Sequence, residues 1–213
     1  MTTNGSRAFP GVVREAIEAG LDSLKFSVNA STPEQFERVM GVKAALREGA
    51  LRNLRVAREV RDNVEQATGH RCGIYASSIR FDGEQHEAME ALLRERVFPW
   101  VDEHYWLPLY SMGPFATRRE EELGYRPIAG NQGRLGALRD PLPCWSAFTE
   151  GHVTAEGKLS ACCFDASGAW EMADLREVSF MAGWNPPRFV ALRRAHLARD
   201  VRGTICEGCV AYV

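Results

Sequence analysis

The sequence predicts an α/β fold followed by a small domain built from a β-hairpin, a helix and cysteine-rich loops. Two observations predict it: helix and strand patterns alternate through the first half of the chain, and five of the six cysteines follow residue 143. Regular alternation implies parallel strands joined by helical crossovers. We therefore expect an incomplete, barrel-like (β/α) domain over residues 1–112, a linker or lid over 113–140, and a cysteine-rich domain over 141–213.

The composition excludes several classes of protein. The 213 residues are 45% hydrophobic, which suits one domain or two small ones with a real core. The net charge of −2 gives no electrostatic case for nucleic acid as a partner. The chain has no apolar run of membrane-spanning length and no signal-peptide layout, so we expect a soluble, cytoplasmic protein. Six cysteines in such a chain indicate metal or redox chemistry rather than disulfides.

The chain opens on TTNG, which has the pattern of a polar strand end followed by a turn at Gly5. A helix follows in FPGVVREAIEAG, with Val13 and Ile17 on one face and Gly20 placed to end it. The segment LDSLKFSVNA then alternates as a strand, with its apolar face formed by Leu24, Phe26 and Val28.

Two helices come next. In STPEQFERVM, Thr32 can cap the helix, Pro33 suits its first turn and Gln35 completes a capping box. A longer helix ends at Thr68–Gly69, and its inward stripe repeats at three- and four-residue intervals: Leu46, Ala50, Leu54, Ala57 and Val64.

The last part of the first half repeats the alternation. RCGIYASSIRF is predicted as a strand, with Cys72 as a buried apolar residue. EQHEAMEALLRERV is predicted as a helix with Met89, Leu92 and Leu93 inward, and YWLPLYS as a strand that Pro108 weakens.

Polar residues gather at the predicted carboxyl ends of these four strands. They are Thr3, Asn4, Ser27, Asn29, Ser77, Ser78, Tyr110 and Ser111. In barrel-like α/β folds this edge is where ligands bind. Each position taken alone also fits an ordinary turn residue, so the pattern leaves both interpretations open.

The cysteines after residue 143 predict a metal site. Ala147, Thr149 and His152 are expected to lead into a turn around Glu156–Gly157, from which Leu159–Cys162 return as the second arm of a hairpin. Such a hairpin brings the cysteines at its two ends close together. The C-x-x-C pair can bind one metal or cluster with them. The predicted four-thiolate site is Cys144, Cys162, Cys206 and Cys209, a donor set that selects zinc or iron–sulfur.

Cys163 is the spare cysteine of this region. It follows Cys162 directly, so strand alternation predicts that it points to the opposite face. It is then either a core thiol or an alternative ligand.

The spacing C-x12-G-x4-C over Cys144, Gly157 and Cys162, followed by a final C-x-x-C, resembles the auxiliary-cluster domain of radical S-adenosylmethionine (SAM) enzymes, the SPASM or shorter twitch domain. The supporting residues also include Cys163, Asp165, Trp184, Phe189, Leu192, Arg193 and His196. The resemblance covers about residues 140–213 and implies an auxiliary [4Fe-4S] cluster held by the four cysteines, for electron transfer or substrate positioning.

The first half resembles the same family. TTNG and AGLDSLKFSVNA are similar to strands three and four of the radical SAM partial barrel, and the two later strands to strands five and six. The resemblance implies that SAM binds at the tips of these strands, through Thr3, Asn4, Ser27, Asn29 and Ser77.

The family's C-x-x-x-C-x-x-C motif and its Gly-Gly-Glu motif are both absent. We therefore expect the C-terminal portion of a radical SAM enzyme, with no catalytic residue of its own and no SAM cleavage alone. SAM would bind only in the intact system. The expected partners are a missing N-terminal barrel part or split partner chain, an electron donor protein, and an unknown substrate of the peptide, sugar or cyclitol class.

A second interpretation stays open. The four thiolates could hold a structural zinc ion in a non-catalytic module. The absent motif favours this interpretation, whereas the matched barrel half is a feature that a zinc module does not need.

Overall fold

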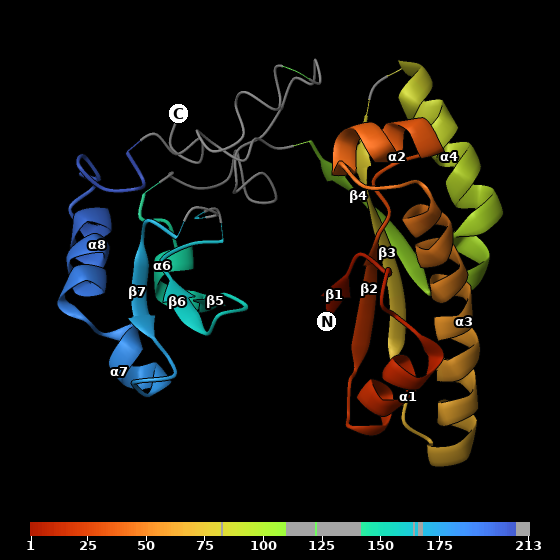
Figure 1. The fold of residues 1–213 in the computed structure, drawn as a ribbon, viewed down its shortest axis with the longest axis horizontal. Coiled ribbons are helices and arrows are strands. Elements are labelled where there is room, and N and C mark those ends of the chain that lie inside the picture. The colour runs from red at the N-terminus through yellow and green to blue at the C-terminus, as the bar shows by residue number, and fades with distance from the viewer. Residues whose placement is uncertain (82, 110–121, 123–141, 164, 166–167, 208–213) are drawn as a thin grey trace. The chain divides into compact units, whose positions relative to one another are not determined.

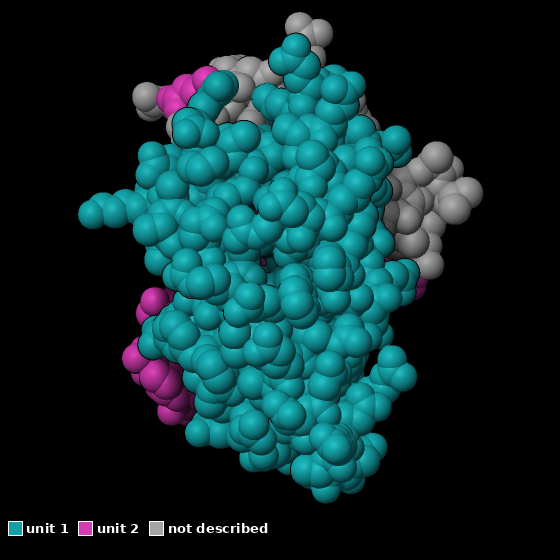
Figure 2. Space-filling view, turned by 90° about the vertical axis from the view of Figure 1, so that its right-hand side faces the viewer, with its two compact units in different colours: residues 1–109 teal, residues 110–213 magenta. Residues whose placement is uncertain are grey.

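A computed structural model of the chain describes residues 1–81, 83–109, 122, 142–163, 165 and 168–207. The chain divides into two compact units, residues 1–109 and 110–213, which Figure 2 distinguishes by colour. Tyr110, Ser111, Cys209 and most of the predicted linker lie outside the described residues.

Unit 1 is built on a parallel sheet of four strands in the order β1-β2-β3-β4. The strands are β1 Thr2–Thr3, β2 Ser23–Ser27, β3 Gly73–Arg80 and β4 Glu103–Pro108. Ser27 pairs with Ser77, and Ser77 pairs with Tyr105, so the strands end at one common edge. The predicted α/β class with parallel strands is confirmed.

Helices cover one side of this sheet. They are α1 Pro10–Glu18, α2 Pro33–Met40, α3 Ala45–Thr68 and α4 Gly83–Arg96, with a 3-10 turn at Phe98–Trp100. Figure 1 shows α1, α3 and α4 along the same side of the strands. The strand residues that alternate toward the helices are fully buried and form the core with the helix stripes: Leu24, Phe26, Ile74 and Ala76.

The predicted helix start at Thr32 and helix end at Gly69 are confirmed. Not every residue predicted to face inward is buried, since Ala50 and Leu92 are only half-buried. The Thr32 hydroxyl accepts a hydrogen bond from the Gln35 amide at 3.1 Å, and Gly69 ends α3 in the left-handed region at φ 75°. The prediction that Leu46 faces inward is wrong, because its side chain is 46% exposed. Leu46 lies in the first turn of α3, where the helix borders a pocket rather than the core.

Unit 2 has an antiparallel sheet of three strands, β5 His152–Val153, β6 Lys158–Ser160 and β7 Glu171–Asp174. Its helices are α6 Ser146–Thr149, α7 Phe180–Trp184 and α8 Pro187–Leu197. One apolar cluster joins α6, β6, β7 and α8: Ala147, Leu159, Ala161, Met172, Phe189 and Leu192.

The hairpin prediction is correct at its turn and wrong in its first arm. β5 and β6 pair on either side of a turn that contains Gly157, at φ 76°. Ala147 and Thr149, however, lie in α6 and not in a strand. The helical turn places Ala147 in the core of unit 2, where its exposed fraction is 4%.

In the part of the chain that the structure describes, no helix is both long and apolar enough to cross a bilayer.

Candidate functional site

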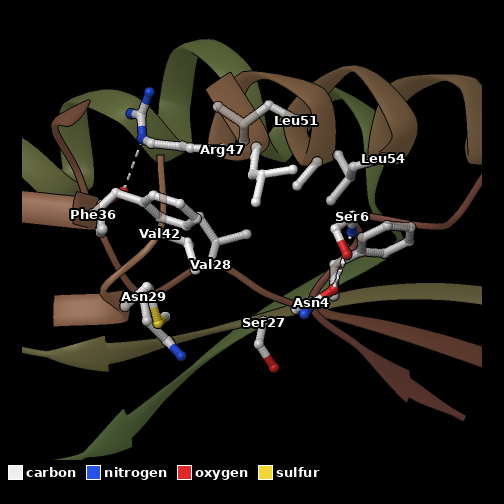
Figure 3. A pocket seen from close by; sticks show the side chains of 15 residues that line it. Asn4, Ser6, Ser27, Val28, Asn29, Phe36, Val42, Arg47, Leu51 and Leu54 are labelled. Atoms are coloured by element: carbon white, nitrogen blue, oxygen red, sulfur yellow. Dashed lines mark hydrogen bonds between the residues drawn. The ribbon is translucent and has the colours of Figure 1, made fainter. Parts of the chain in front are cut away.

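A pocket of about 260 Å³ opens beside the carboxyl ends of β1 and β2 in unit 1. Three of the five predicted SAM-binding residues line it, namely Asn4, Ser27 and Asn29. Figure 3 shows these polar side chains along one edge, across from Leu51 and Leu54 of α3. Parallel strands thus bring residues from distant parts of the sequence to one concave surface.

Two of these polar side chains are held by hydrogen bonds from backbone amides. Asn4 Oδ1 accepts hydrogen bonds from the Ser6 amide at 3.0 Å and the Ser6 hydroxyl at 2.8 Å. Asn29 Oδ1 accepts from the Ile79 amide at 3.3 Å, which ties the end of β2 to β3. Both residues therefore have defined positions at the rim of the pocket.

The other two predicted residues do not line the pocket. The Thr3 hydroxyl accepts a hydrogen bond from the Gly5 amide at 3.1 Å and so stabilises the turn after β1. Ser77 is buried, and its carbonyl oxygen accepts from the Val28 amide at 2.9 Å. Both residues support the backbone from which the pocket-lining side chains project.

Sequence reasoning missed the apolar wall of the pocket. The wall comes from β2, α2, the connection after α2, and α3: Phe26, Val28, Phe36, Met40, Val42, Leu46, Ala50, Leu51 and Leu54. The signal that could have found it is Met40 and Val42, two apolar residues at and just beyond the end of a helix. Neither belongs to the inward stripe predicted for a helix, so both could line a pocket.

Arg47 also lines this pocket, and its charge is already satisfied. It donates to the carbonyl oxygens of Ala30, at 3.3 Å, and Ser31, and it pairs with Glu48. Its buried guanidinium ties α3 to the segment after β2. Arg47 therefore stabilises the wall of the pocket, and its guanidinium is already bound by groups of the protein.

Three of the four predicted ligands are described, and all three belong to unit 2. Cys144 lies just before α6 and is 7% exposed. Cys162 is half-buried and comes two residues after β6 ends at Ser160. Cys206 is half-buried in the turn region after α8 and packs against the core cluster.

The expectation that Cys163 points away from Cys162 is wrong. A hydrogen bond with the Cys162 side chain lowers the pKa of the Cys163 thiol to about 7, against the opposing effect of burial. The charges of Glu150 and Cys144 also act on Cys163 and raise its pKa. Because β6 ends before these cysteines, strand alternation does not apply to them.

A buried carboxylate holds the loop that follows Cys162. Asp165 Oδ2 accepts hydrogen bonds from the Ser160 hydroxyl at 3.0 Å and from the Trp170 amide at 2.9 Å. The Asp165 amide in turn donates to the Cys162 carbonyl oxygen at 3.1 Å. Cys162 is thus held between Ser160, which precedes it, and Asp165, which follows it, and these two residues are hydrogen-bonded to each other.

The helix α8 holds the segment of Cys144. The Cys144 amide donates to Nδ1 of His196 at 3.4 Å, and the ring of His196 is fully buried. Burial lowers the pKa of His196, which keeps the ring neutral and Nδ1 able to accept.

The donor chemistry suits a soft metal or an iron–sulfur cluster. The described cysteines form no disulfide with one another, and thiolates select zinc or iron–sulfur over hard cations. Among the described residues, no three histidine, cysteine or acidic side chains converge as the ligands of a single metal ion. Because Cys209 lies outside those residues, the predicted set of four ligands stays a prediction.

Comparison with known families bears on the cysteine-rich part of the chain. Residues 144–210 match the SPASM family, described as an iron-sulfur cluster-binding domain. All four predicted ligand cysteines fall inside this range. No curated protein and no solved structure matches the chain. The match thus supports an iron–sulfur-binding module in the C-terminal part of the chain.

Proposed function

We propose that this chain is the auxiliary-cluster portion of a radical SAM enzyme. Its C-terminal module would hold a [4Fe-4S] cluster through Cys144, Cys162, Cys206 and Cys209. The observation that carries the proposal is the SPASM match over residues 144–210, a range that contains all four of these cysteines. When bound, such a cluster supplies one-electron transfer or a place to hold substrate.

The surroundings of the described ligands support this role. Cys144 is buried beside α6, and Asp165 fixes the loop after Cys162. Supported ligands of this kind hold a cluster with little rearrangement. Four thiolates would leave no iron with an open coordination site, so the proposed role is electron transfer or positioning and not SAM cleavage.

The pocket of unit 1 is the proposed place for SAM in the intact system. Asn4, Ser27 and Asn29 offer amide and hydroxyl groups to the polar parts of the ligand, and the wall from α2 and α3 offers apolar contact. Thr3 and Ser77 would act by holding the strand ends that carry these residues.

A further chain segment or a partner chain would supply the C-x-x-x-C-x-x-C motif that this sequence lacks. In the described sheet β1 is an edge strand, and an edge strand can pair with another strand. The intact enzyme would also need an electron donor protein. Its substrate would belong to the peptide, sugar or cyclitol class.

A structural zinc site is the second candidate, because the same four thiolates suit tetrahedral zinc. In that case the module would hold the metal for folding only. The zinc site and the auxiliary cluster would use the same four cysteines, so the identity of the bound metal decides between the two functions.

The test is the iron, sulfide and zinc content of anaerobically purified protein, together with its visible spectrum. About four irons and four sulfides per chain, with a brown colour, are expected for the auxiliary cluster. Stoichiometric zinc without sulfide would establish the structural site instead, and the proposed electron transfer would be wrong.

A further inference from the structure

Two polar side chains of α8 hold the segment that carries Cys144, and their spacing matches that of their targets. Arg193 and His196 are three residues apart on α8, and Ala147 and Cys144 are three residues apart on the facing segment. Nε of Arg193 donates to the Ala147 carbonyl oxygen at 2.7 Å. Nδ1 of His196 accepts from the Cys144 amide at 3.4 Å. Side chains three apart lie on one helix face, so α8 holds the segment at two points.

Arg193 is itself fixed in place. Its Nη1 donates to the Trp184 carbonyl oxygen at 2.7 Å. Its guanidinium carbon lies 4.3 Å from the ring centroid of Trp184 and 3.9 Å from that of Phe189. A planar cation stacked in this way has little freedom, so Ala147 is bound to a rigid point of the core.

His196 is fixed in the same way. Its ring is buried and lies edge-on to Phe148, with 6.5 Å between the centroids. Since Nδ1 accepts a hydrogen bond from Cys144, the ring proton of the neutral imidazole is on Nε2. The Cys144 amide therefore donates its hydrogen bond to His196 and not to the sulfur of a cysteine.

We propose that Arg193 and His196 are positioning residues that set the backbone of Cys144 for cluster binding. The proposal rests on the proposed cluster site and adds a role for α8. Arg193 holds the far end of the helical turn, and His196 orients the peptide group of the ligand itself. Hydrogen bonds to ligand sulfurs shift the potential of a cluster, and an amide of Cys144 that donates to His196 would not donate to such a sulfur.

The test compares four substitutions in the full chain after anaerobic reconstitution. Arg193→Met removes the donor to the Ala147 carbonyl oxygen. His196→Leu removes the acceptor, His196→Asn keeps an acceptor oxygen near the position of Nδ1, and Arg194→Ala changes the exposed neighbour on the same helix. The measurements are iron and sulfide per chain, the rate of iron loss to a chelator, and the midpoint potential of the remaining cluster. Circular dichroism and thermal unfolding check that each variant folds.

His196→Leu is expected to weaken iron retention by about 10–100-fold, the usual effect of losing a contact behind a metal ligand. Any cluster that it retains is expected to have a more positive potential, because the freed Cys144 amide can turn toward a sulfur. His196→Asn and Arg194→Ala are expected to retain iron at nearly the level of the unmodified protein. If His196→Leu does not fold, His196→Asn and Arg193→Met carry the test, with iron loss expected only for Arg193→Met.

The outcomes separate the two proposals. Suppose that the unmodified protein binds metal and that the folded His196→Leu and Arg193→Met variants match it in iron retention and cluster potential. That result would overturn the positioning role alone. Folded His196→Asn that loses iron as fast as His196→Leu would also overturn it, because an acceptor would not be what matters. If the unmodified protein holds zinc, the proposed electron transfer is contradicted. The retention of zinc in the same variants then tests the positioning role of Arg193 and His196. Unmodified protein without any metal would overturn both proposals.

Discussion

Arg61 of α3 and Asp102, next to β4, form a hydrogen-bonded ion pair, with Nη1 of Arg61 2.8 Å from Oδ2 of Asp102. Arg61 is 2% exposed and also donates to the carbonyl oxygen of Cys72 at 2.9 Å. Asp102 accepts in turn from the Ile74 amide at 2.8 Å. The pair thus joins the longest helix of unit 1 to two strands, at the edge of the sheet remote from the pocket.

We predict that Asp102→Asn destabilises unit 1 in a pH-dependent way. Burial alone would raise the pKa of Asp102, but the hydrogen bonds from Arg61 and the Ile74 amide outweigh it, so the pKa lies below its usual value. The ionised carboxylate therefore stabilises the fold above the unfolded pKa of about 4, and this stability is lost as the pH falls through the folded pKa. Breaking the pair is expected to cost about 2–4 kcal/mol at pH 7.

Urea unfolding at pH 7 and at pH 3 tests this prediction. The difference in unfolding free energy between the unmodified protein and Asp102→Asn should shrink at the lower pH. Asp22→Asn, which changes an exposed carboxylate at the same end of the sheet, is the control and should have little effect at either pH. A difference of the same size at both pH values would show that the charge of Asp102 is not what stabilises the pair.

A second prediction concerns the choice between the two adjacent cysteines. Cys162→Ser should lose most of the bound iron, as should Cys144→Ser, Cys206→Ser and Cys209→Ser, because each removes a proposed direct ligand. Cys163→Ser should retain most of it, since Cys163 is exposed and is not in the proposed ligand set. Iron content after identical reconstitution is the measurement. Equal iron loss in Cys162→Ser and Cys163→Ser would place both thiols, or the wrong one, in the proposed ligand set.

A third prediction concerns the carboxylate behind Cys162. Asp165→Ala removes the acceptor for the Ser160 hydroxyl and the Trp170 amide, so the loop that carries Cys162 should lose its fixed conformation. We expect iron to be lost to a chelator about tenfold faster than from the unmodified protein. Asp200→Ala is the matched control, because Asp200 is exposed and pairs with Arg202. Retention in Asp165→Ala equal to that in the control would remove Asp165 from the support of the site.

The accuracy of the sequence predictions depends on how far apart the determining contacts lie. Local signals were sufficient at Thr32, which caps its helix with its own hydroxyl, and at Gly69, where the backbone needs a positive φ. The helical turn at Ala147 was missed, because a carbonyl contact from Arg193, 46 residues away, helps to hold it. The side-chain direction of Cys163 was missed because it depends on where β6 ends, which the alternating pattern does not give.

The same limit applies to the two candidate sites. The polar rim at Asn4, Ser27 and Asn29 was predicted, since parallel strands end at one edge whatever their lengths. The apolar wall was not, because Leu46 fits the stripe of its helix and only the three-dimensional path after α2 places it at the pocket. Thr3 and Ser77 fit the same sequence pattern but do not line the pocket. The Thr3 hydroxyl accepts from the Gly5 amide, and the Ser77 carbonyl oxygen accepts from the Val28 amide.

The last prediction tests the pocket of unit 1 with S-adenosylhomocysteine as a probe that cannot be cleaved. Asn29→Ala removes a polar rim group, and we expect binding to weaken by about tenfold, the equivalent of one hydrogen bond to the ligand. Lys43→Ala, an exposed change in the segment after α2, should bind like the unmodified protein. Titration calorimetry on the full chain measures both, and thermal unfolding checks that losing the contact from Asn29 to the Ile79 amide leaves the sheet intact. Every described residue that lines the pocket belongs to unit 1, so the chain alone is expected to bind this probe weakly, even after the four ligand cysteines are replaced by serine, whereas SAM itself is expected to bind only in the intact system. Binding that Asn29→Ala does not change would place the ligand elsewhere and separate the pocket from the proposed radical SAM function.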